Sequence, residues 1–331
     1  AKKYIADNNI QLYTINAIDK AIEIGMGKRT NTILQSAFFK LANVMPIDEA
    51  VDFMKAAAKK SYGKKGDAVV EMNYKAIDAG VDAVHKVEVP ASWSNPEADP
   101  APAKLTGRPE TVKMVEDLMN PIALMDGDSL PVSAFMGNPD GQFEQGASAY
   151  EKRGTAVTVP TWDAAKCIQC NQCAFVCPHA VIRPVVMTEE EIKNAPEGMQ
   201  YTPMTGMPGY YYAIVVSVDD CTGCNLCSTQ CPGNKKSEVL TMSSYQDNKD
   251  KQAFFDYAVT LPEKEEIYEK FAKTTVKGSQ FAHPYLEFSG ACAGCGETPY
   301  AKLVTQLFGD RMYIANATGC SSIWGNSSPS T

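Results

Sequence analysis

Hydrophobic residues recur at helical spacing in four successive segments near the start of the chain. These segments are 14–27, 30–44, 46–63 and 67–84. Apolar side chains three or four residues apart share one helix face, so each segment predicts a helix. Glycines close the first helix, and Thr30 or Asn31 can cap the second. With short strands between them, these helices predict the end of an α/β domain over residues 1–107.

A proline-rich stretch, residues 90–110, follows these helices. Such a composition is typical of linkers. Residues 108–149 hold one short apolar segment and then turn-forming residues, which predicts a small connecting domain. Alternating apolar residues over 156–162 predict a strand beyond it.

Composition argues against several classes of protein. The 331 residues allow two or three domains, and 44% hydrophobic with 21% charged residues are typical of a globular protein. A net charge of −8, without a Lys/Arg-rich block, argues against a nucleic-acid partner. No apolar run is long enough to span a bilayer and no export signal is visible, so we expect no membrane partner and a cytoplasmic location. The chain starts without Met, and we expect a piece of a longer polypeptide.

Eight of the 11 cysteines form two copies of one motif, C-x2-C-x2-C-x3-C-P. This spacing is that of bacterial ferredoxins with two 4Fe–4S clusters. Three thiolates in a tight loop can face one cluster, while the fourth faces away and binds the other cluster. We therefore assign one cluster to Cys167, Cys170, Cys173 and Cys231. The second cluster takes Cys221, Cys224, Cys227 and Cys177.

Two other uses of these cysteines fit the spacing less well. A tetrahedral zinc site needs two CxxC pairs and has no use for the third cysteine or for the proline. Disulfide frameworks are spread through small secreted chains, whereas these cysteines are clustered in a larger one. The pattern favours iron–sulfur clusters in a reducing compartment.

The 43 residues between the two motifs, 178–220, exceed what a minimal two-cluster ferredoxin needs. They include an acidic stretch, 188–198, and an aromatic and β-branched stretch, 210–218. We predict that the second stretch is a strand that pairs near the first motif and packs over the clusters. The insertion is either a surface excursion or a docking patch for an electron partner.

The last three cysteines lie apart from these motifs. Cys292 and Cys295 lie in a glycine-rich loop before a predicted amphipathic helix, and Cys320 lies in a Gly/Ser loop after a predicted strand. Such loops at strand ends bind ligands in α/β folds. The trio could form a zinc half-site, structural thiols, or three of four ligands of another cluster. A fourth thiolate would then lie beyond Thr331 or on another chain.

The remaining motifs are less informative. We predict packing or surface roles for His85, His179 and His283. Motifs of hydrolases and of P-loop proteins do not occur, so neither class is supported.

Several segments resemble those of pyruvate:ferredoxin oxidoreductases, a family of large thiamine-diphosphate-dependent enzymes. The chain as a whole resembles a middle-to-late portion of that family's sequence. The matching segments are 29–42, 69–80, 151–167, the two cysteine motifs, 289–300 and 317–325.

The resemblance implies oxidative decarboxylation of pyruvate with coenzyme A to acetyl-CoA and CO2, with electrons passing to ferredoxin or flavodoxin. It implies a third 4Fe–4S cluster on Cys292, Cys295 and Cys320, with the fourth ligand outside this chain. It places Glu297 and Cys320 near thiamine diphosphate, as catalytic and cofactor-binding residues.

The resemblance also places Asn31 and Asn73 near coenzyme A, although helix capping or surface exposure explains these two residues equally well. Further expectations are Mg2+ bound outside this chain, a homodimer, and contacts with the remainder of the polypeptide. The family's stretch that binds Mg2+ and diphosphate does not occur here, so this segment alone should not turn over pyruvate.

Two alternatives remain open at this stage. One is an iron–sulfur electron-carrier subunit without its own active site, and the other is an oxidoreductase for another 2-oxoacid. In every case the predicted fold class is a multidomain α/β protein. After the α/β domain and connecting domain come a ferredoxin-like α+β domain with two 4Fe–4S clusters over 150–262 and the start of a thiamine-binding α/β domain over 263–331.

Overall fold

The structure is a computed structural model that describes residues 1–27, 29–97, 104–141 and 143–326. The chain divides into two compact units, Ala1–Ala103 and Lys104–Thr331. Part of the predicted proline-rich linker, residues 98–103, lies outside the described residues. None of the described helices has both the length and the apolar character needed to cross a membrane.

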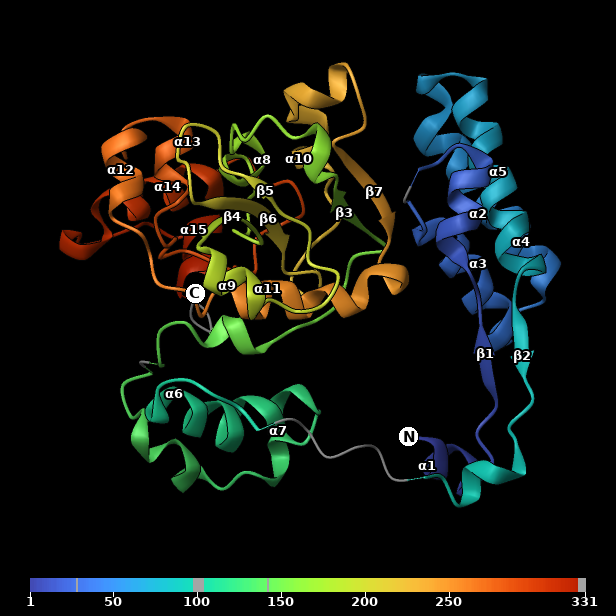
Figure 1. Cartoon of the computed structure of the whole chain (residues 1–331). Helices are drawn as coiled ribbons and strands as arrows, with labels where there is room; N and C mark the ends of the chain where they lie inside the picture. The colour runs from blue at the N-terminus through green and yellow to red at the C-terminus, as the bar shows by residue number, and fades with distance from the viewer. Residues whose placement is uncertain (28, 98–103, 142, 327–331) are drawn as a thin grey trace. The chain divides into compact units, whose positions relative to one another are not determined.

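Helices make up most of the first unit (Figure 1). The helices are α1 (Lys2–Asp7), α2 (Ala17–Ile24), α3 (Asn31–Ala42), α4 (Ile47–Tyr62) and α5 (Asp67–Asp82). Two short strands, β1 (Leu12–Thr14) and β2 (His85–Val87), pair antiparallel, with Leu12 opposite Val87. The four predicted helices are thus confirmed as α2 to α5.

The ends of these helices match the predictions only in part. Gly25 closes α2 with φ of 90°, a left-handed conformation that glycine adopts without a steric penalty. Thr30 stands at the N-cap of α3, but its side chain makes no capping hydrogen bond, and Asn31 is already the first helical residue. The predicted cap is therefore wrong. The backbone of Thr30, at φ −104° and ψ −10°, is close to helical, whereas a capping residue has non-helical dihedrals.

A close crossing of α3 and α5 forms the core of the first unit. Ile33 and Ile77 are fully buried there, and the Ser36 hydroxyl donates to the Ile77 carbonyl oxygen at 2.6 Å. Gly80 makes the crossing possible, since a Cβ at that position would lie 2.1 Å from the Ile33 carbonyl oxygen. Any larger residue must force the two helices apart.

We predict that Gly80→Ala destabilises the first unit, because the added methyl group overlaps the backbone of α3. The free energy of unfolding should fall by about 1–3 kcal/mol, even though alanine is the better helix former. Urea unfolding followed by circular dichroism measures this change. The matched control is Gly63→Ala, where a Cβ would meet nothing within 4 Å. Equal stability of the two variants would contradict the prediction.

The second unit combines short strands with many short helices (Figure 1). Its strands are β3 (Thr158–Trp162), β4 (Ile182–Met187), β5 (Thr202–Pro203), β6 (Tyr211–Val216) and β7 (Leu240–Ser244). Its helices are α6 (Pro109–Met114), α7 (Asn120–Ala123), α8 (Gln172–Phe175), α9 (Glu189–Lys193), α10 (Leu226–Gln230), α11 (Gln252–Ala258), α12 (Glu266–Lys270), α13 (Val276–Ser279), α14 (Thr298–Phe308) and α15 (Cys320–Asn326).

The strands form two antiparallel groups. β3 pairs with β7, and β6 lies between β4 and β5 in a three-stranded sheet. The predicted strands over 156–162 and 210–218 are confirmed as β3 and β6. The predicted pairing is also confirmed, because β6 pairs with β4, which begins soon after the first cysteine motif.

A separate small core holds the region of α6 and α7 together. A short π-helix, Val115–Met119, joins the two helices. Met114, Leu118 and Ala147 are buried with Val115 in this core. These residues lie within the predicted connecting segment 108–149.

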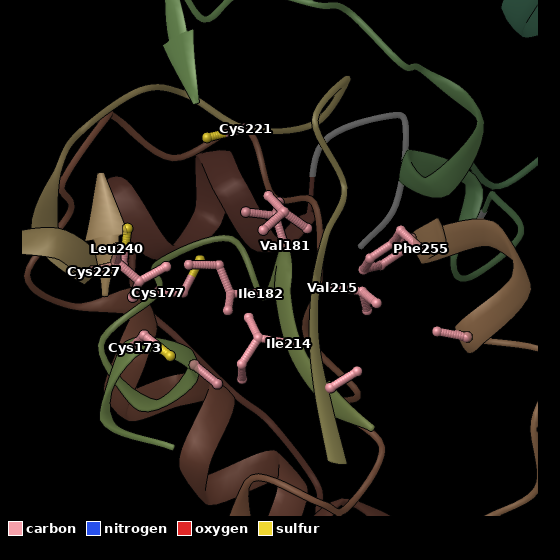
Figure 2. Packing of buried hydrophobic residues seen from close by; sticks show 14 of the residues in the cluster. Cys173, Cys177, Val181, Ile182, Ile214, Val215, Cys221, Cys227, Leu240 and Phe255 are labelled. Atoms are coloured by element: carbon pink, nitrogen blue, oxygen red, sulfur yellow. The ribbon is translucent and has the colours of Figure 1, made fainter. Parts of the chain in front are cut away.

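One large apolar core runs through the rest of the second unit. It contains buried cysteines of both motifs beside Ile182, Ile214 and Leu240 (Figure 2). Ile267 and Phe288 belong to the same core, so packing continues without a break past residue 262. The residues that follow the two motifs are therefore part of their immediate surroundings.

The predicted strand before Cys320 is wrong. Residues 312–317 have no regular structure, and Tyr313 and Ile314 are exposed. A strand needs a partner for its backbone groups, and no strand within the described ranges pairs with this segment. Cys320 begins helix α15 instead of lying within a loop.

Candidate metal centres

The first cysteine motif forms a tight loop because two of its residues adopt left-handed backbone conformations. Gln169 has φ of 57° and Asn171 has φ of 59°. The backbone N–H of Gln169 donates to Cys167 Sγ at 3.3 Å. Cys173 follows within the short helix α8. These turns bring the first three thiols of the motif to one side of the loop.

The second motif repeats the same conformation at equivalent positions. Gly223 and Asn225 have φ of 64° and 66°, and the Gly223 N–H donates to Cys221 Sγ at 3.4 Å. A Cβ on Gly223 would lie 2.9 Å from the Thr158 carbonyl oxygen of β3, so this position requires glycine. The repeat in sequence is therefore also a repeat in backbone geometry.

Each of two cavities is lined by four cysteines, three from one motif and one from the other. The first is lined by Cys167, Cys170, Cys173 and Cys231 together with Trp162, Tyr212 and Leu240. The second is lined by Cys177, Cys221, Cys224 and Cys227 together with Pro160, Val181 and Ile182. These two sets match the two crossed ligand sets predicted from sequence. Four thiols around one apolar cavity are the donor set that a 4Fe–4S cluster requires.

Burial makes these thiols hard to ionise without a metal. It raises the pKa of Cys221 to about 12 and raises the pKa of Cys173 well above its ordinary value. Nearby thiols add to the effect: Cys227 raises the pKa of Cys173, and Cys177 raises that of Cys221. Thiolates bind iron, so the positive charge of the iron must offset this cost. Among the described residues, no three His, Cys, Asp or Glu side chains converge on a position for one metal ion.

A buried polar network supports the first cavity. The Tyr212 hydroxyl donates to Asn171 Oδ1 at 2.7 Å, and Asn171 Nδ2 donates to the Lys277 carbonyl oxygen at 2.8 Å. Both side chains are almost fully buried. The network fixes the left-handed turn of the loop and ties it to α13. Our sequence analysis missed Asn171, although its place directly after Cys170, matched by Asn225 after Cys224, is a usable signal.

Asn234 performs a similar task after the second motif. Its Nδ2 donates to the Leu240 carbonyl oxygen at 2.7 Å, and its Oδ1 accepts from the Val239 N–H at 2.8 Å. These bonds fasten the segment after Cys231 to the start of β7. Sequence analysis missed this residue too, since a single Asn after Cys-Pro-Gly carries no distinctive pattern.

The third set of cysteines is less enclosed. Cys292 and Cys320 are exposed, and Cys295 is half-buried just before α14. Burial raises the pKa of Cys295, but hydrogen bonds from the backbones of Thr298 and Glu297 outweigh it, so the pKa lies below its ordinary value. A helix N-terminus favours a thiolate in this way. Cys295 is thus suited to bind a metal ion.

The loop between Cys292 and Cys295 packs against the second motif. Gly294 has φ of 74°, and a Cβ there would lie 3.6 Å from Cys224 Cβ. Glu297 is exposed at the N-cap of α14, and its N–H donates to Cys295 Sγ at 3.4 Å. The third cluster, and the roles of Glu297 and Cys320 toward thiamine diphosphate, stay predictions.

A larger cavity lies in the first unit, between α3, α4 and α5. It has a volume of about 480 Å³, within the range of ligand sites, and both Asn31 and Asn73 line it. Asn73 is buried and its Nδ2 donates to the Val69 carbonyl oxygen at 2.8 Å, whereas Asn31 is exposed. The structure therefore brings together the two amides predicted to lie near coenzyme A.

The three histidines occupy different environments. His179 is buried with Nδ1 3.0 Å from the Ser289 carbonyl oxygen, and burial lowers its pKa. His85 lies in β2 and is exposed, as is His283. These positions agree with packing and surface roles.

One buried cation escaped the sequence analysis. Lys302 of α14 is 1% exposed and donates to backbone carbonyl oxygens near the first motif. Burial lowers its pKa to about 8, so its ammonium form still predominates at neutral pH. A lysine in an amphipathic helix normally indicates a solvent-exposed face, so the sequence would predict an exposed side chain where the structure has a buried one.

Several known proteins are similar in sequence to this chain over nearly its whole length. A pyruvate-flavodoxin oxidoreductase of Enterobacter agglomerans is 50% identical over 329 residues, which are 99% of this chain and 27% of the relative. A pyruvate:ferredoxin oxidoreductase of Moorella thermoacetica is 49% identical over 331 residues, with the same two coverages. A pyruvate dehydrogenase (NADP(+)) of Cryptosporidium parvum is 46% identical over 355 residues, which are 99% of this chain and 18% of the relative.

Family models divide the chain between them. The model described as pyruvate ferredoxin/flavodoxin oxidoreductase matches residues 1–83. The chain belongs to this oxidoreductase family. A 4Fe-4S binding domain matches residues 159–182, and a domain of unknown function called EKR matches residues 98–156. The chain spans 27% of the length of the first two relatives, so it corresponds to one portion of them.

We predict that the two four-cysteine sets, called the quartets below, bind two 4Fe–4S clusters in the crossed arrangement, and paired substitutions test this. In the crossed arrangement Cys177 and Cys221 serve the same cluster, so Cys177→Ser with Cys221→Ser should remove one cluster, about four iron atoms, and leave the other. Cys173→Ser with Cys221→Ser is the matched control and should remove both clusters. Iron analysis and EPR of the reduced protein measure the result. Loss of both clusters in the first variant would contradict the crossing.

Proposed function

We propose that this chain is the electron-relay portion of a pyruvate:ferredoxin or pyruvate:flavodoxin oxidoreductase. The whole enzyme converts pyruvate and coenzyme A to acetyl-CoA, CO2, two electrons and one proton. The electrons leave through 4Fe–4S clusters to ferredoxin or flavodoxin. The observation that supports this most is the pair of four-cysteine cavities in a chain about 50% identical to pyruvate oxidoreductases.

Packing supports an order for the relay. The loop of Cys292 and Cys295 lies against Cys224 of the second cavity. Cys173 of the first cavity is close enough to Cys227 of the second that Cys227 raises the pKa of Cys173. In the first cavity, Cys167 and Cys170 are only half-buried and Ile168 between them is 61% exposed. Electrons would therefore pass from the third cluster to the second cavity, then to the first, and leave at that exposed edge.

Thiamine diphosphate, when bound, supplies the carbanion chemistry that decarboxylation needs. We assign this chain only part of its site: Glu297 at the start of α14 and Cys320 at the start of α15. Cys320 would join Cys292 and Cys295 on the third cluster, and its fourth ligand and the Mg2+ ligands would come from the remainder of the polypeptide. Assembly as a homodimer in the cytoplasm completes this proposal.

Coenzyme A would bind at the cavity of the first unit. Asn31 and Asn73 offer amide groups that suit a pantetheine arm. Lysines flank the cavity-lining Ser61 and Tyr62: Lys59 and Lys60 precede them in the last turn of α4, and Lys64 and Lys65 follow them. Such positive charge attracts phosphate groups.

The two alternatives make different demands on the chain. An electron carrier without an active site has no use for a thiolate-stabilising helix at Cys295 or for an amide-lined cavity of 480 Å³. An oxidoreductase for another 2-oxoacid would differ in substrate contacts, and the relatives named above are all named for pyruvate. Activity of the full-length protein with pyruvate against longer 2-oxoacids separates these cases.

We predict about twelve iron atoms and as many acid-labile sulfides per chain in the anaerobically purified full-length protein, four for each of three clusters. In the Cys320→Ala variant about eight should remain, because only the third cluster loses a ligand, and pyruvate oxidation should be strongly impaired. Iron and sulfide analysis, low-temperature EPR and a coenzyme A-dependent assay measure these changes. Full iron content with normal activity in the variant would refute a role for Cys320, and zinc in the quartets would refute the relay.

We also predict that Asn31→Ala weakens the use of coenzyme A. One lost hydrogen bond is worth about 1 kcal/mol, so the KM for coenzyme A should rise about fivefold, with the KM for pyruvate and the iron content unchanged. The control is Asn8→Ala, another exposed asparagine of the first unit that does not line the cavity. An unchanged KM in Asn31→Ala would place coenzyme A elsewhere.

A further inference from the structure

Lys302 is a fully buried lysine whose hydrogen-bond partners are all backbone carbonyls. It projects from α14, and its Nζ donates to the carbonyl oxygens of Ala174, Phe175 (3.2 Å) and Cys177 (3.3 Å). Its residue exposure is only 1%. Within the described part of the chain, no carboxylate forms an ion pair with it.

These carbonyls lie on the short segment that joins the two cavities. Cys173, which lines the first cavity, precedes them, and Cys177, which lines the second, carries one of them. The ammonium group is therefore close to one cysteine of each set, Cys173 and Cys177. Arg183 is the other nearby cation, but it is paired with Glu287, so its charge is already balanced.

A buried ammonium without a counter-charge is costly. Removing the charge from water is unfavourable, and carbonyl dipoles alone offset only part of that penalty. Four thiolates on a 4Fe–4S core leave the cluster with a net negative charge, and one more electron makes it more negative. Two such clusters beside Lys302 would supply the missing counter-charge.

We propose that Lys302 is the shared counter-charge of the two quartet clusters and favours their reduced states. The proposal rests on the proposed function, because it requires clusters at both quartets. A fixed cation near a cluster stabilises the added electron, so it raises the reduction potential. Since Lys302 belongs to the helix that follows Cys295, the residue also holds the third cysteine loop beside the quartets.

Redox titration of the full-length holoprotein, followed by EPR, tests this role. In Lys302→Met the side chain keeps its length and loses its charge. We expect the ratio of reduced to oxidised quartet clusters at a fixed potential to fall at least tenfold, which is about 59 mV for a one-electron couple. Lys302→Arg should remain close to the wild type. The matched control is Lys273→Met, which removes an exposed lysine that lies over the Tyr268 ring.

The outcomes separate this proposal from the relay itself. The proposal is overturned if Lys302→Met keeps its iron and its ratio of reduced to oxidised quartet clusters changes less than twofold. Lys302 would then serve only to bind the carbonyl oxygens at the end of α8. If Lys302→Met loses its clusters, Lys302→Gln, which keeps a hydrogen-bond donor without the charge, decides the same comparison. Absence of iron from the wild-type quartets would instead refute the proposed function.

Discussion

The backbone of the CxxC loops is the constraint on which the rest of this region depends. The first CxxC segment of each motif and the loop of Cys292 and Cys295 share one feature. The residue before the second cysteine has a positive φ in all three: Gln169, Gly223 and Gly294. The left-handed turn lets two thiols separated by two residues face the same cavity. Glycine adopts this turn freely, whereas a residue with a side chain needs external support. Gln169 has that support, because its Nε2 donates to the Pro203 carbonyl oxygen and its Oε1 accepts from the Thr205 N–H, both at 2.9 Å.

Those supporting bonds explain why the insertion between the motifs is not a simple surface excursion. The segment around β5 supplies the partners of Gln169, and β6 supplies Tyr212, whose hydroxyl holds Asn171. On its other side the insertion reaches the solvent, where α9 begins with a capping box between Thr188 and Glu191. One part of the insertion thus stabilises the first cysteine loop, and only the rest is a surface feature.

The sequence predicted the cysteine sets and the main helices because their signals are local. The C-x2-C-x2-C-x3-C-P repeat contains its own geometry, and the helical spacing of α2 to α5 needs no tertiary information. The predictions failed where a distant partner decides the outcome. The segment before Cys320 has strand-like residues but no strand beside it, and the cap expected of Thr30 was absent because its backbone is already helical. Lys302 was missed for the same reason, since its carbonyl partners lie more than a hundred residues away in the sequence.

Helix α14 combines two electrostatic effects that act on different cysteines. Its N-terminus presents backbone N–H groups to Cys295 and lowers the pKa of that thiol. One turn further along, its lysine brings a positive charge to the segment between the two quartets. Both effects favour negative charge on sulfur, and both depend on the same docking of α14 against the core. A shift of this helix would therefore disturb the third cysteine set and the quartets together, which is why we regard residues 263–309 as part of the redox site.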